Sequence, residues 1–368
     1  MRILQVCSAD EMGGGEVHVA DLVRALASRG HTVHLAVRPE SPLRDPLSEA
    51  TAEWHELPLR NSLDVQSARA MAGLIKAHEI EIVHAHVGRD YLVAALACRQ
   101  APASKLILTR HHYLPLNRSA IYRWLLSDVA AVIAVSDSVR ASVLERVGLP
   151  LGRVRTIPNW IDPARFQPME RDAARAIFGL RANVVVGCVG QLAAAKGQEE
   201  FVRAAARVSQ MRPDVEFVLA GEEKEQGKPF SAQLSEIAKS LGVATKLRFL
   251  GYVPNIPELF AAVDVVVVPS WDEGFSLVTI EALAARRAVL GSNVGGIAGI
   301  IRDNQNGLLF PPRDVHAMTD KLLWLVSDAP LRERLAVQGQ RDVYSRFGRE
   351  QVIDQIEALY LEVLGRTA

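Results

Sequence analysis

Each half of the chain begins with the same local pattern: a short apolar strand, a glycine-containing loop and an amphipathic helix. In the first half, the strand Arg2–Cys7 precedes the triple Gly13-Gly14-Gly15 and a helical pattern. In the second half, the strand Val184–Val189 precedes Gly190 and another helical pattern. Strand–loop–helix starts of this kind are typical of doubly wound α/β domains. The sequence therefore predicts two Rossmann-like domains.

Further apolar, β-branched segments alternate with helical patterns along both halves. The strands expected from this alternation are His31–Arg38, Glu81–His86, Lys105–Thr109, Ala130–Val135, Val215–Ala220, Leu247–Leu250, Val263–Val268 and Ala288–Gly291. Because each of them is mostly apolar, they indicate parallel sheets that are covered by helices on both faces.

A proline-rich turn cluster, Ile157–Pro163, marks the expected boundary between the two domains. We expect a first domain over residues 1–163 and a second over residues 164–346. After a break at Phe347-Gly348, an acid-rich helical pattern closes the chain. We expect this last segment, residues 347–368, to return to the first domain.

Composition narrows the functional class. The chain has 368 residues, and its 42 Lys plus Arg balance its 42 Asp plus Glu. This balance argues against a nucleic-acid-binding protein.

No apolar run approaches the length of a membrane span, and the N-terminus reads as a first strand instead of a signal peptide. The cysteines have no metal-like spacing and indicate buried thiols in a reducing compartment. A cytoplasmic protein is expected.

The segment from Glu273 to Glu281 carries the strongest chemical signal. It follows the apolar run Val265–Val268, so Glu273 should lie in a loop at the carboxyl end of a strand, where open α/β sheets bind ligands. Ser276 can cap the helix that carries Glu281. The backbone N–H groups of residues 276–278 would then face a bound anion. One acid beside a sugar and one beside a ribose, with a phosphate between them, would fit this layout.

Other interpretations of the two acids remain open at this stage. In one alternative, Glu273 is a solvated loop acid and Glu281 a surface helix residue. A glycosidase is less favoured, because its two carboxyl groups lie about 5–10 Å apart. Eight residues of helix would separate the two glutamates by roughly 12 Å.

Two glycine loops are candidate anion sites. Lys196 stands where a helix begins, so its charge opposes the helix dipole unless an anion such as a diphosphate is bound there. The Gly13–Gly15 loop also precedes a helix, but it lacks the G-x-G-x-x-G pattern and is equally consistent with a tight turn. Glu16 beside it can simply favour the helix dipole.

Histidines follow two strand ends. His84 and His86 should share one face of their strand, but no carboxylate or third histidine stands at a usual metal-ligand spacing, so we expect no metal. His111 and His112 follow another strand, where one of them can contact a ligand or cap a loop. The segment Arg118–Leu126 mixes aromatic, aliphatic and basic residues, which fits either core packing or contact with a membrane surface.

Taken in order, these segments resemble retaining glycosyltransferase family 4 of the GT-B fold. The residues that carry the resemblance are Gly13-Gly14-Gly15-Glu16, Thr109-Arg110-His111, Ala134-Val135-Ser136, Ile157-Pro158-Asn159, Val189-Gly190, Lys196-Gly197, Gly251-Tyr252-Val253, Glu273, Glu281 and Asn306–Pro312. The resemblance covers nearly the whole chain. It implies two doubly wound domains that face a central cleft, with the acceptor on the first domain and a nucleotide-sugar mainly on the second.

The resemblance also implies roles for individual residues. His111, Glu273 and Lys196 would serve catalysis: His111 near the anomeric carbon, Glu273 on the sugar hydroxyls and Lys196 on the diphosphate. Glu281 would bind the ribose and Val253 the base. The full donor-binding set would be Gly14, Gly15, Gln191, Lys196, Val253, Glu273, Gly274, Phe275, Ser276, Leu277 and Glu281. Candidates on the acceptor side are Glu16, His86 and His112.

Such enzymes need no metal or other cofactor, since the nucleotide-sugar is a co-substrate and helix termini with a cation stabilise the leaving diphosphate. The expected acceptor is a glycan or a lipid-linked molecule of cell-surface polysaccharide or lipopolysaccharide type, which would place the enzyme in the cytoplasm or peripherally at the inner face of the membrane. The chain departs from the family at Gln191, where an arginine is usual, and at Ala298-Gly299, where Pro-Glu is frequent. A nucleotide-sugar epimerase and a non-catalytic nucleotide-sugar-binding protein are the alternatives.

Overall fold

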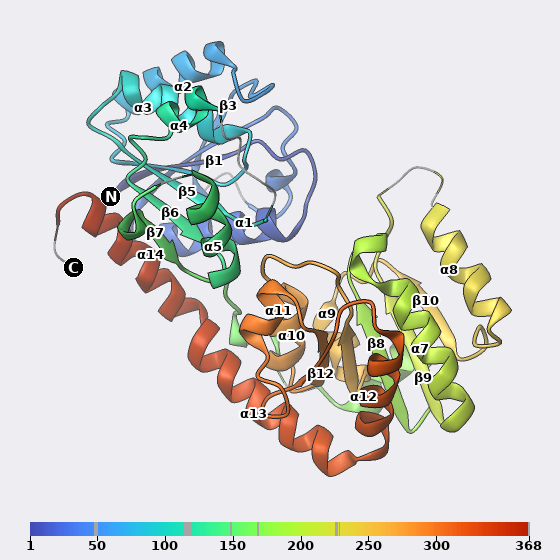
Figure 1. Cartoon of the computed structure of the whole chain (residues 1–368). Coiled ribbons are helices and arrows are strands. Elements are labelled where there is room, and N and C mark those ends of the chain that lie inside the picture. The colour runs from blue at the N-terminus through green and yellow to red at the C-terminus, as the bar shows by residue number, and fades with distance from the viewer. Residues whose placement is uncertain are drawn as a thin grey trace. The chain divides into compact units, whose positions relative to one another are not determined.

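In the computed structural model the chain folds into two compact units (Figure 1). The structure describes residues 1–47, 51–113, 119–147, 149–167, 169–224, 227 and 229–366. One unit comprises Met1–Asn159 together with Glu350–Ala368, and the other comprises Trp160–Arg349. The unit boundary lies within the proline-rich cluster that the sequence marks as a turn.

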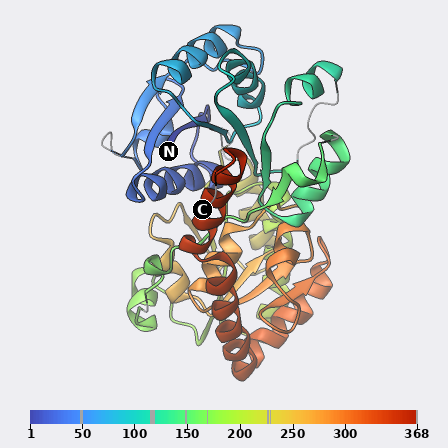
Figure 2. The same ribbon diagram turned by 90° about the vertical axis from the view of Figure 1, so that its left-hand side faces the viewer.

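The first unit is a seven-stranded parallel sheet in the order β3-β2-β1-β4-β5-β6-β7. Helices lie on both sides of these strands (Figure 2). Its elements are β1 (Arg2–Cys7), α1 (Gly14–Ser28), β2 (Thr32–Val37), a 3-10 turn (Pro42–Arg44), β3 (Glu53–Glu56), α2 (Val65–Ala77), β4 (Ile82–Ala85), α3 (Asp90–Gln100), β5 (Lys105–Arg110), α4 (Ala120–Leu125), β6 (Ala131–Ala134), α5 (Asp137–Val147), a 3-10 turn (Leu151–Arg153), β7 (Val154–Thr156) and α14 (Arg349–Val363).

The second unit is a six-stranded parallel sheet in the order β10-β9-β8-β11-β12-β13. Its elements are a 3-10 turn (Pro163–Arg165), α6 (Arg171–Ile177), β8 (Val184–Val189), a 3-10 turn (Ala194–Lys196), α7 (Gln198–Met211), β9 (Val215–Ala220), α8 (Pro229–Ser240), β10 (Leu247–Gly251), α9 (Ile256–Ala262), β11 (Val265–Val268), α10 (Leu277–Ala284), β12 (Ala288–Ser292), α11 (Gly295–Ile300), β13 (Leu308–Phe310), α12 (Val315–Ser327) and α13 (Ala329–Phe347).

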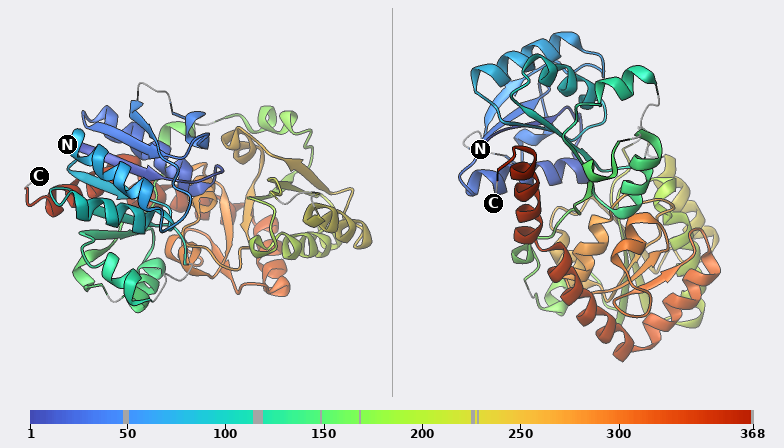
Figure 3. Two further views of the ribbon diagram at one scale, coloured as in Figure 1. Left: turned by 90° about the horizontal axis from the view of Figure 1, so that it is seen from above. Right: turned by 60° about the vertical axis from the view of Figure 1, so that its left-hand side comes forward.

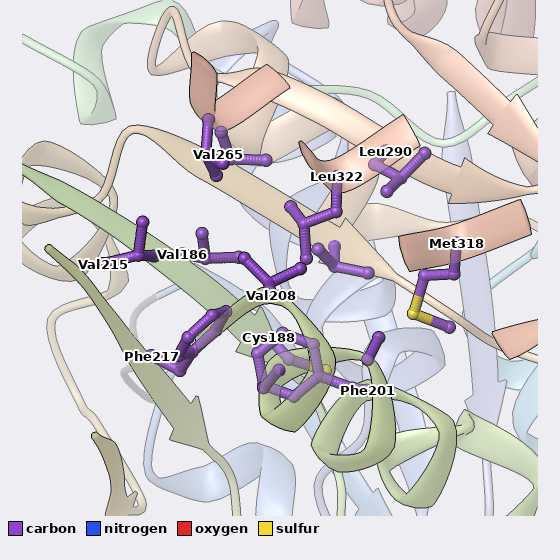
Figure 4. Close-up of a cluster of buried hydrophobic side chains, with 14 of the residues drawn as sticks. Val186, Cys188, Phe201, Val208, Val215, Phe217, Val265, Leu290, Met318 and Leu322 are labelled. Carbon is purple, nitrogen blue, oxygen red and sulfur yellow. The ribbon is translucent and has the colours of Figure 1, made fainter. Parts of the chain in front are cut away.

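The core of the second unit shows why its strands read as apolar runs. Val186 of β8 and Val265 of β11 point into a cluster that also holds Phe201 of α7 and Leu322 of α12 (Figure 4). All four side chains are completely buried. Strands covered on both faces have no solvent-facing side, so they lack the alternation of half-buried strands.

The closing helix α14 belongs to the first unit, beside the sheet of that unit (Figure 3). Its fully buried Tyr360 places its hydroxyl 2.6 Å from Nδ1 of His84 on β4. The segments that lead out of and back into this unit are joined, because Ile161 N–H donates to the carbonyl of Phe347 at 2.8 Å and Arg349 N–H donates to that of Ile161 at 3.0 Å.

Strands β3, β7 and β13 are absent from the sequence-based expectations. All of them are short and occupy the edge of a sheet. An edge strand pairs on one side only and needs less apolar burial, so a segment such as Glu53–Glu56 lacks the apolar pattern that reveals the central strands.

Candidate functional site

Both sheets place glycine loops at the point where the strand order reverses. In the second unit, β8 lies between β9 and β11, and its connection leads away from β11. Gly190 follows β8, and the loop with Glu273 follows β11. Open α/β sheets bind ligands in the crevice outside the carboxyl ends of two such strands. The two strongest sequence signals of this unit therefore lie together at the position where open α/β sheets bind ligands.

Lys196 and Glu273 meet there. The Lys196 Nζ atom donates to Oε2 of Glu273 at 2.6 Å. The lysine ends the 3-10 turn Ala194–Lys196, directly before α7. Its side chain is 36% exposed and that of the glutamate 15%, so the pair lies partly open to solvent. A cation and a carboxylate at this position can bind a phosphate oxygen and a sugar hydroxyl respectively.

The loop after β8 is held by a residue that the sequence reasoning missed. The Gln198 side chain is 1% exposed, and its amide donates to the carbonyl of Gln191 at 2.8 Å. The N–H of Trp271 donates to the carbonyl of Ala195 at 2.8 Å, which joins this loop to the loop after β11. A polar residue at the start of an amphipathic helix gives no signal of such a role, because residues of this type are usually exposed to solvent.

Two glycines allow the loops to approach each other. Gly197 caps α7 with φ +71°, and a Cβ atom there would lie 2.1 Å from the carbonyl oxygen of Pro269. Gly296 is the second residue of α11, and a Cβ atom there would lie 2.5 Å from the carbonyl oxygen of Gly274. Larger residues would push both neighbours away from the carboxyl end of β11.

The predicted cap of helix α10 is confirmed. Ser276 Oγ accepts from the N–H of Thr279 at 3.3 Å and starts α10. The same helix carries Glu281, whose Oε1 lies 3.9 Å from a guanidinium nitrogen of Arg165. Glu281 is partly buried, with an 18% exposed side chain, and is therefore neither a freely solvated acid nor a core residue.

The remaining predicted donor residues of this unit are placed as follows. Gln191 is exposed, Val253 and Phe275 are buried, and Gly274 and Leu277 are half-buried. Gly299 has open space around its Cα, since a Cβ atom there would meet nothing within 4 Å. The glutamate that the family often carries at this position would therefore fit this backbone.

In the first unit the predicted glycine loop borders His111. Gly13 caps α1, and a Cβ atom on Gly15 would lie 3.7 Å from Cδ2 of His111. The His111 ring also lies 5.0 Å from that of His18 on α1 and 6.1 Å from that of His86, centroid to centroid. His86 follows β4, so this cluster lies at the strand-order reversal between β1 and β4.

His111 carries polar atoms that the protein leaves without hydrogen bonds. Both ring nitrogens are shielded from solvent, and neither has a hydrogen-bond partner in the described part of the chain. Burial, with smaller effects of His112 and Arg110, lowers the pKa of His111 to about 3. Buried polar atoms are normally satisfied, so a pair without partners is a mark of a ligand-contacting group.

The other histidines of this region differ in role. His84 and His86 share one face, as predicted, with ring centroids 4.2 Å apart. His84 is satisfied by Tyr360 and by Thr109, each at 2.6 Å, and is a structural residue of the core. His86 lies 2.7 Å from Oε1 of Gln5 through Nε2. Burial lowers the pKa of His86 well below its usual value.

The strand-end loop that leads to Gly13 is fixed by another residue that the sequence reasoning missed. Asp90, the first residue of α3, accepts from the N–H of Ser8 at 2.9 Å. Burial raises the pKa of Asp90 to about 6, although the hydrogen bonds with Ser8 oppose this shift. A carboxylate at a helix start usually serves the helix dipole, which hides its second role from a sequence reading.

Within the described ranges of the chain, two groups of side chains could hold a metal ion by geometry. His18, His86 and His111 form one, without a carboxylate; His34, Glu53, His55 and His78 form the other. The sequence spacing revealed neither, because both groups gather residues from different elements. The prediction that catalysis requires no metal stays a prediction.

The remaining acceptor-side candidates lie near α1 and β5. Glu16 stands in the first turn of α1, and His112 is exposed beside His111. In the segment Arg118–Leu126, Arg118 lies outside the described residues. Helix α4 buries Leu125 and exposes Trp124, over whose ring the Arg99 guanidinium stacks at 3.8 Å. Among the described helices, none has the length and apolar character to cross a membrane.

Comparison with protein families gives two adjacent matches. The model "Glycosyltransferase Family 4" matches residues 12–165, and the model "Glycosyl transferases group 1" matches residues 170–342. Together they follow the two units of the structure closely.

Similar proteins extend over the full chain. The N-acetyl-alpha-D-glucosaminyl L-malate synthase of Bacillus anthracis is 24% identical, over 96% of this chain and 95% of that protein. A D-inositol 3-phosphate glycosyltransferase of Stackebrandtia nassauensis is 27% identical, over 97% and 88% respectively.

Among solved structures, a glycosyltransferase from Rickettsia africae has a TM-score of 0.89 at 20% identity, covering 99% of this chain and 98% of its own. The Anabaena protein HepE in complex with UDP has a TM-score of 0.87 at 22% identity, covering 97% and 98%. At this level of identity these structures establish the same fold.

Proposed function

Because this chain belongs to the group 1 glycosyltransferases of the GT-B fold, we propose that it transfers a sugar from a nucleoside-diphosphate sugar to a glycan or lipid-linked acceptor and retains the anomeric configuration. The product would serve the synthesis of a cell-surface polysaccharide or lipopolysaccharide.

The contact between Lys196 and Glu273 is the observation that carries the proposal. The pair lies at the strand-order reversal of the second sheet, where an open α/β sheet binds its ligand. In the proposed complex, Lys196 moves its ammonium group toward the diphosphate and Glu273 accepts hydrogen bonds from the transferred sugar. The positive end of α10, capped by Ser276, lies in the same loop region and favours the phosphate charge.

Glu281 would bind the ribose hydroxyls in this arrangement. It follows the cap of α10 and is partly buried, so its carboxylate can accept hydrogen bonds in a site with restricted solvent. Val253, buried after β10, would contact the base through its backbone. The structures of HepE with UDP support a nucleotide of this class, although their likeness to this chain is one of fold.

His111 is proposed to contact the transferred sugar near the anomeric carbon. Both of its ring nitrogens are buried without a hydrogen-bond partner among the described residues, which favours contact with a hydrogen-bonding ligand. A neutral imidazole can donate from one nitrogen and accept at the other. The lowered pKa of His111 keeps it neutral at neutral pH, so its ring would polarise a sugar oxygen without competing for the diphosphate charge.

A second acceptor class is favoured by the names of the full-length relatives. One relative is named for L-malate and another for inositol 3-phosphate, both small polar acids. A small acidic acceptor is therefore the second candidate. The two classes are separated by offering each acceptor with the same donor.

We further propose that the transfer needs no metal ion, since Lys196 and helix termini can stabilise the leaving diphosphate. Activity should persist at full rate in excess chelator. Loss of activity that a divalent cation restores would contradict the proposed mechanism.

The test begins with a thermal-shift panel of nucleotide-sugars. A donor at 100 times its dissociation constant stabilises the folded protein by about 2.7 kcal/mol. The donor that shifts the melting temperature is then incubated with glycan or lipid-linked acceptors and, separately, with malate and inositol phosphate. Mass spectrometry detects the product, and NMR reads the anomeric configuration. Donor binding without turnover of any acceptor, or release of an epimerised nucleotide-sugar, would overturn the proposal.

A further inference from the structure

A group of side chains in the first unit lies apart from the Gly13–Gly15 loop. It consists of His34 on β2, Glu53 and His55 on β3, and His78, which caps the end of α2. Helices of a parallel α/β sheet run opposite to the strands, so a helix end lies near the amino ends of the strands. The group therefore lies at the amino ends of the strands, whereas the loops of the proposed reaction lie at the carboxyl ends.

The strand register explains how these residues meet. His34 pairs with Glu53, and Ala36 pairs with His55. Alternation along a strand puts Glu53 and His55 on one face, together with His34. His78, which caps α2, lies against this face, since its ring centroid is 4.6 Å from that of His34 and 5.2 Å from that of His55.

The separations of the polar atoms match one coordination sphere. His34 Nδ1 lies 3.1 Å from Nε2 of His55 and 3.3 Å from Oε2 of Glu53. The same glutamate oxygen lies 3.6 Å from Nδ1 of His78. Ligand atoms at about 2.0–2.1 Å from a zinc ion and at tetrahedral angles to one another are about 3.3 Å apart. These distances require only small movements to admit an ion.

The chemistry of the donor set fits zinc. Three imidazoles and one carboxylate are ligands that zinc accepts, and four protein ligands complete a tetrahedron. The site is also accessible, because the side chain of Glu53 is 58% exposed and that of His78 35% exposed. Burial lowers the pKa of His34, in spite of the opposing effect of Glu53, and burial likewise lowers that of His55. Neutral imidazoles are the form that binds metal.

We propose that His34, Glu53, His55 and His78 bind one zinc ion, which fastens edge strand β3 and the end of helix α2 to β2. With all four positions taken by protein ligands, the ion has no open site for substrate, and its role is structural. Strand β3 has only four residues and one neighbouring strand. A metal bridge would anchor this short edge strand in addition to its pairing with β2 and the ion pair between Arg44 and Glu56.

The test compares the wild-type protein with His55→Gln/His78→Gln, after removal of metals by a chelator and dialysis. These two histidines are chosen because His34 is only 2% exposed and its loss would threaten folding. The matched control is His316→Gln, which removes an exposed histidine from α12 in the other unit. Zinc binding is measured by calorimetry, and Co²⁺ is added as a spectroscopic probe of tetrahedral geometry.

One zinc ion per chain should bind to the wild-type protein and to the control. The double variant should bind zinc at least a hundredfold more weakly. Saturating zinc should raise the first melting transition by about 5 °C in the wild type and not in the double variant. Cobalt should give the intense visible bands of a tetrahedral site. Equal zinc binding by the double variant would overturn the proposal. So would the absence of zinc binding by the wild type, which would identify the group as a hydrogen-bonded histidine cluster.

Discussion

Lys196 Nζ lies 2.6 Å from Oε2 of Glu273, so two side chains assigned to different parts of the donor form one ion pair. The lysine precedes α7 and the glutamate follows β11. Their contact spans the two loops that border the strand-order reversal. A bound nucleotide-sugar would have to enter between them or pull them onto separate oxygens, so the two residues should act as a coupled unit.

The coupling can be measured by a double-mutant cycle. Lys196→Ala should remove a charge-assisted contact of roughly 1.5–3 kcal/mol, which corresponds to a drop in kcat/KM of about ten- to a few-hundred-fold. Glu273→Gln should lower kcat/KM as well. The double variant should lose less than the product of the two effects, because each single variant leaves the other charge without its partner.

The control for this cycle is Lys239→Ala. Lys239 forms a pair of similar length with Glu236, at 2.7 Å, but both side chains are more than half exposed. Its loss should leave kcat/KM unchanged. Additive effects of the Lys196 and Glu273 substitutions would show that their ion pair has no part in donor binding.

The two glutamates should separate by role. Glu281, proposed on the ribose, contacts a part that nucleoside diphosphate and nucleotide-sugar share, so Glu281→Gln should weaken both. Glu273→Gln should scarcely affect the free nucleotide and should strongly reduce turnover, since contacts to the reacting sugar can strengthen in the transition state. Calorimetric titration of nucleoside diphosphate into each variant, beside its rate, tests this. If both variants lose nucleotide affinity equally, the proposed donor orientation is wrong.

The sequence predicted the central strands and the family, because buried parallel strands are continuous apolar runs and the loops after them carry glycines and charges. Strand β8 has the predicted bounds, and β11 lies within the predicted segment. The edge strand β3 lacked a signal, since its side chains are exposed or half-buried. Its existence depends on the neighbouring strand, which a local pattern cannot show.

The same distinction holds for the candidate site. Glu273, Lys196 and the Ser276 cap were predicted, because their positions next to strands and helix starts follow from local patterns. Gln198 and Asp90 were not, since each acts by a hydrogen bond to a backbone group in a distant or folded-back loop. Pairings of this kind, like the His34–Glu53 register, depend on tertiary structure.

Gly197 is predicted to be required for two reasons: its positive φ angle and the close approach of its loop to Pro269. Gly197→Ala would have to adopt φ +71° and would bring Cβ to 2.1 Å from the Pro269 carbonyl oxygen. Gly242 has the same φ of +71°, and a Cβ atom there meets nothing within 4 Å. Gly242→Ala should therefore cost only the left-handed strain of about 1–2 kcal/mol.

Gly197→Ala should destabilise the second unit by more than this control and also weaken donor binding, because the displaced Pro269 lies in the strand end that leads to Glu273. Denaturant unfolding and nucleotide titration of both variants provide the comparison. Equal stability of the two variants would show that the close approach of the loops is easily relaxed.

The first unit should lose stability as the pH falls from 7 to 5. Burial lowers the pKa values of His84 and His111 to about 3, whereas an unfolded histidine has a pKa of about 6.5. Between these values the unfolded chain binds a proton that the folded chain does not, so the free energy of unfolding rises with pH in this window. As the pH falls from 7 to 5, each such imidazole should lower the free energy of unfolding by about 2 kcal/mol.

His111→Gln tests this argument, because the ring nitrogens of His111 make no hydrogen bond with the described residues that the substitution would break. Denaturant unfolding is measured across the pH range with chelator present. Between pH 7 and pH 5, the free energy of unfolding of His111→Gln should fall by about 2 kcal/mol less than that of the wild type. His316→Gln, which changes an exposed residue of α12, should match the wild type. If His111→Gln retains the full dependence, the His111 ring takes up its proton in the folded state, and its proposed role as a neutral hydrogen-bonding group on the sugar is also wrong.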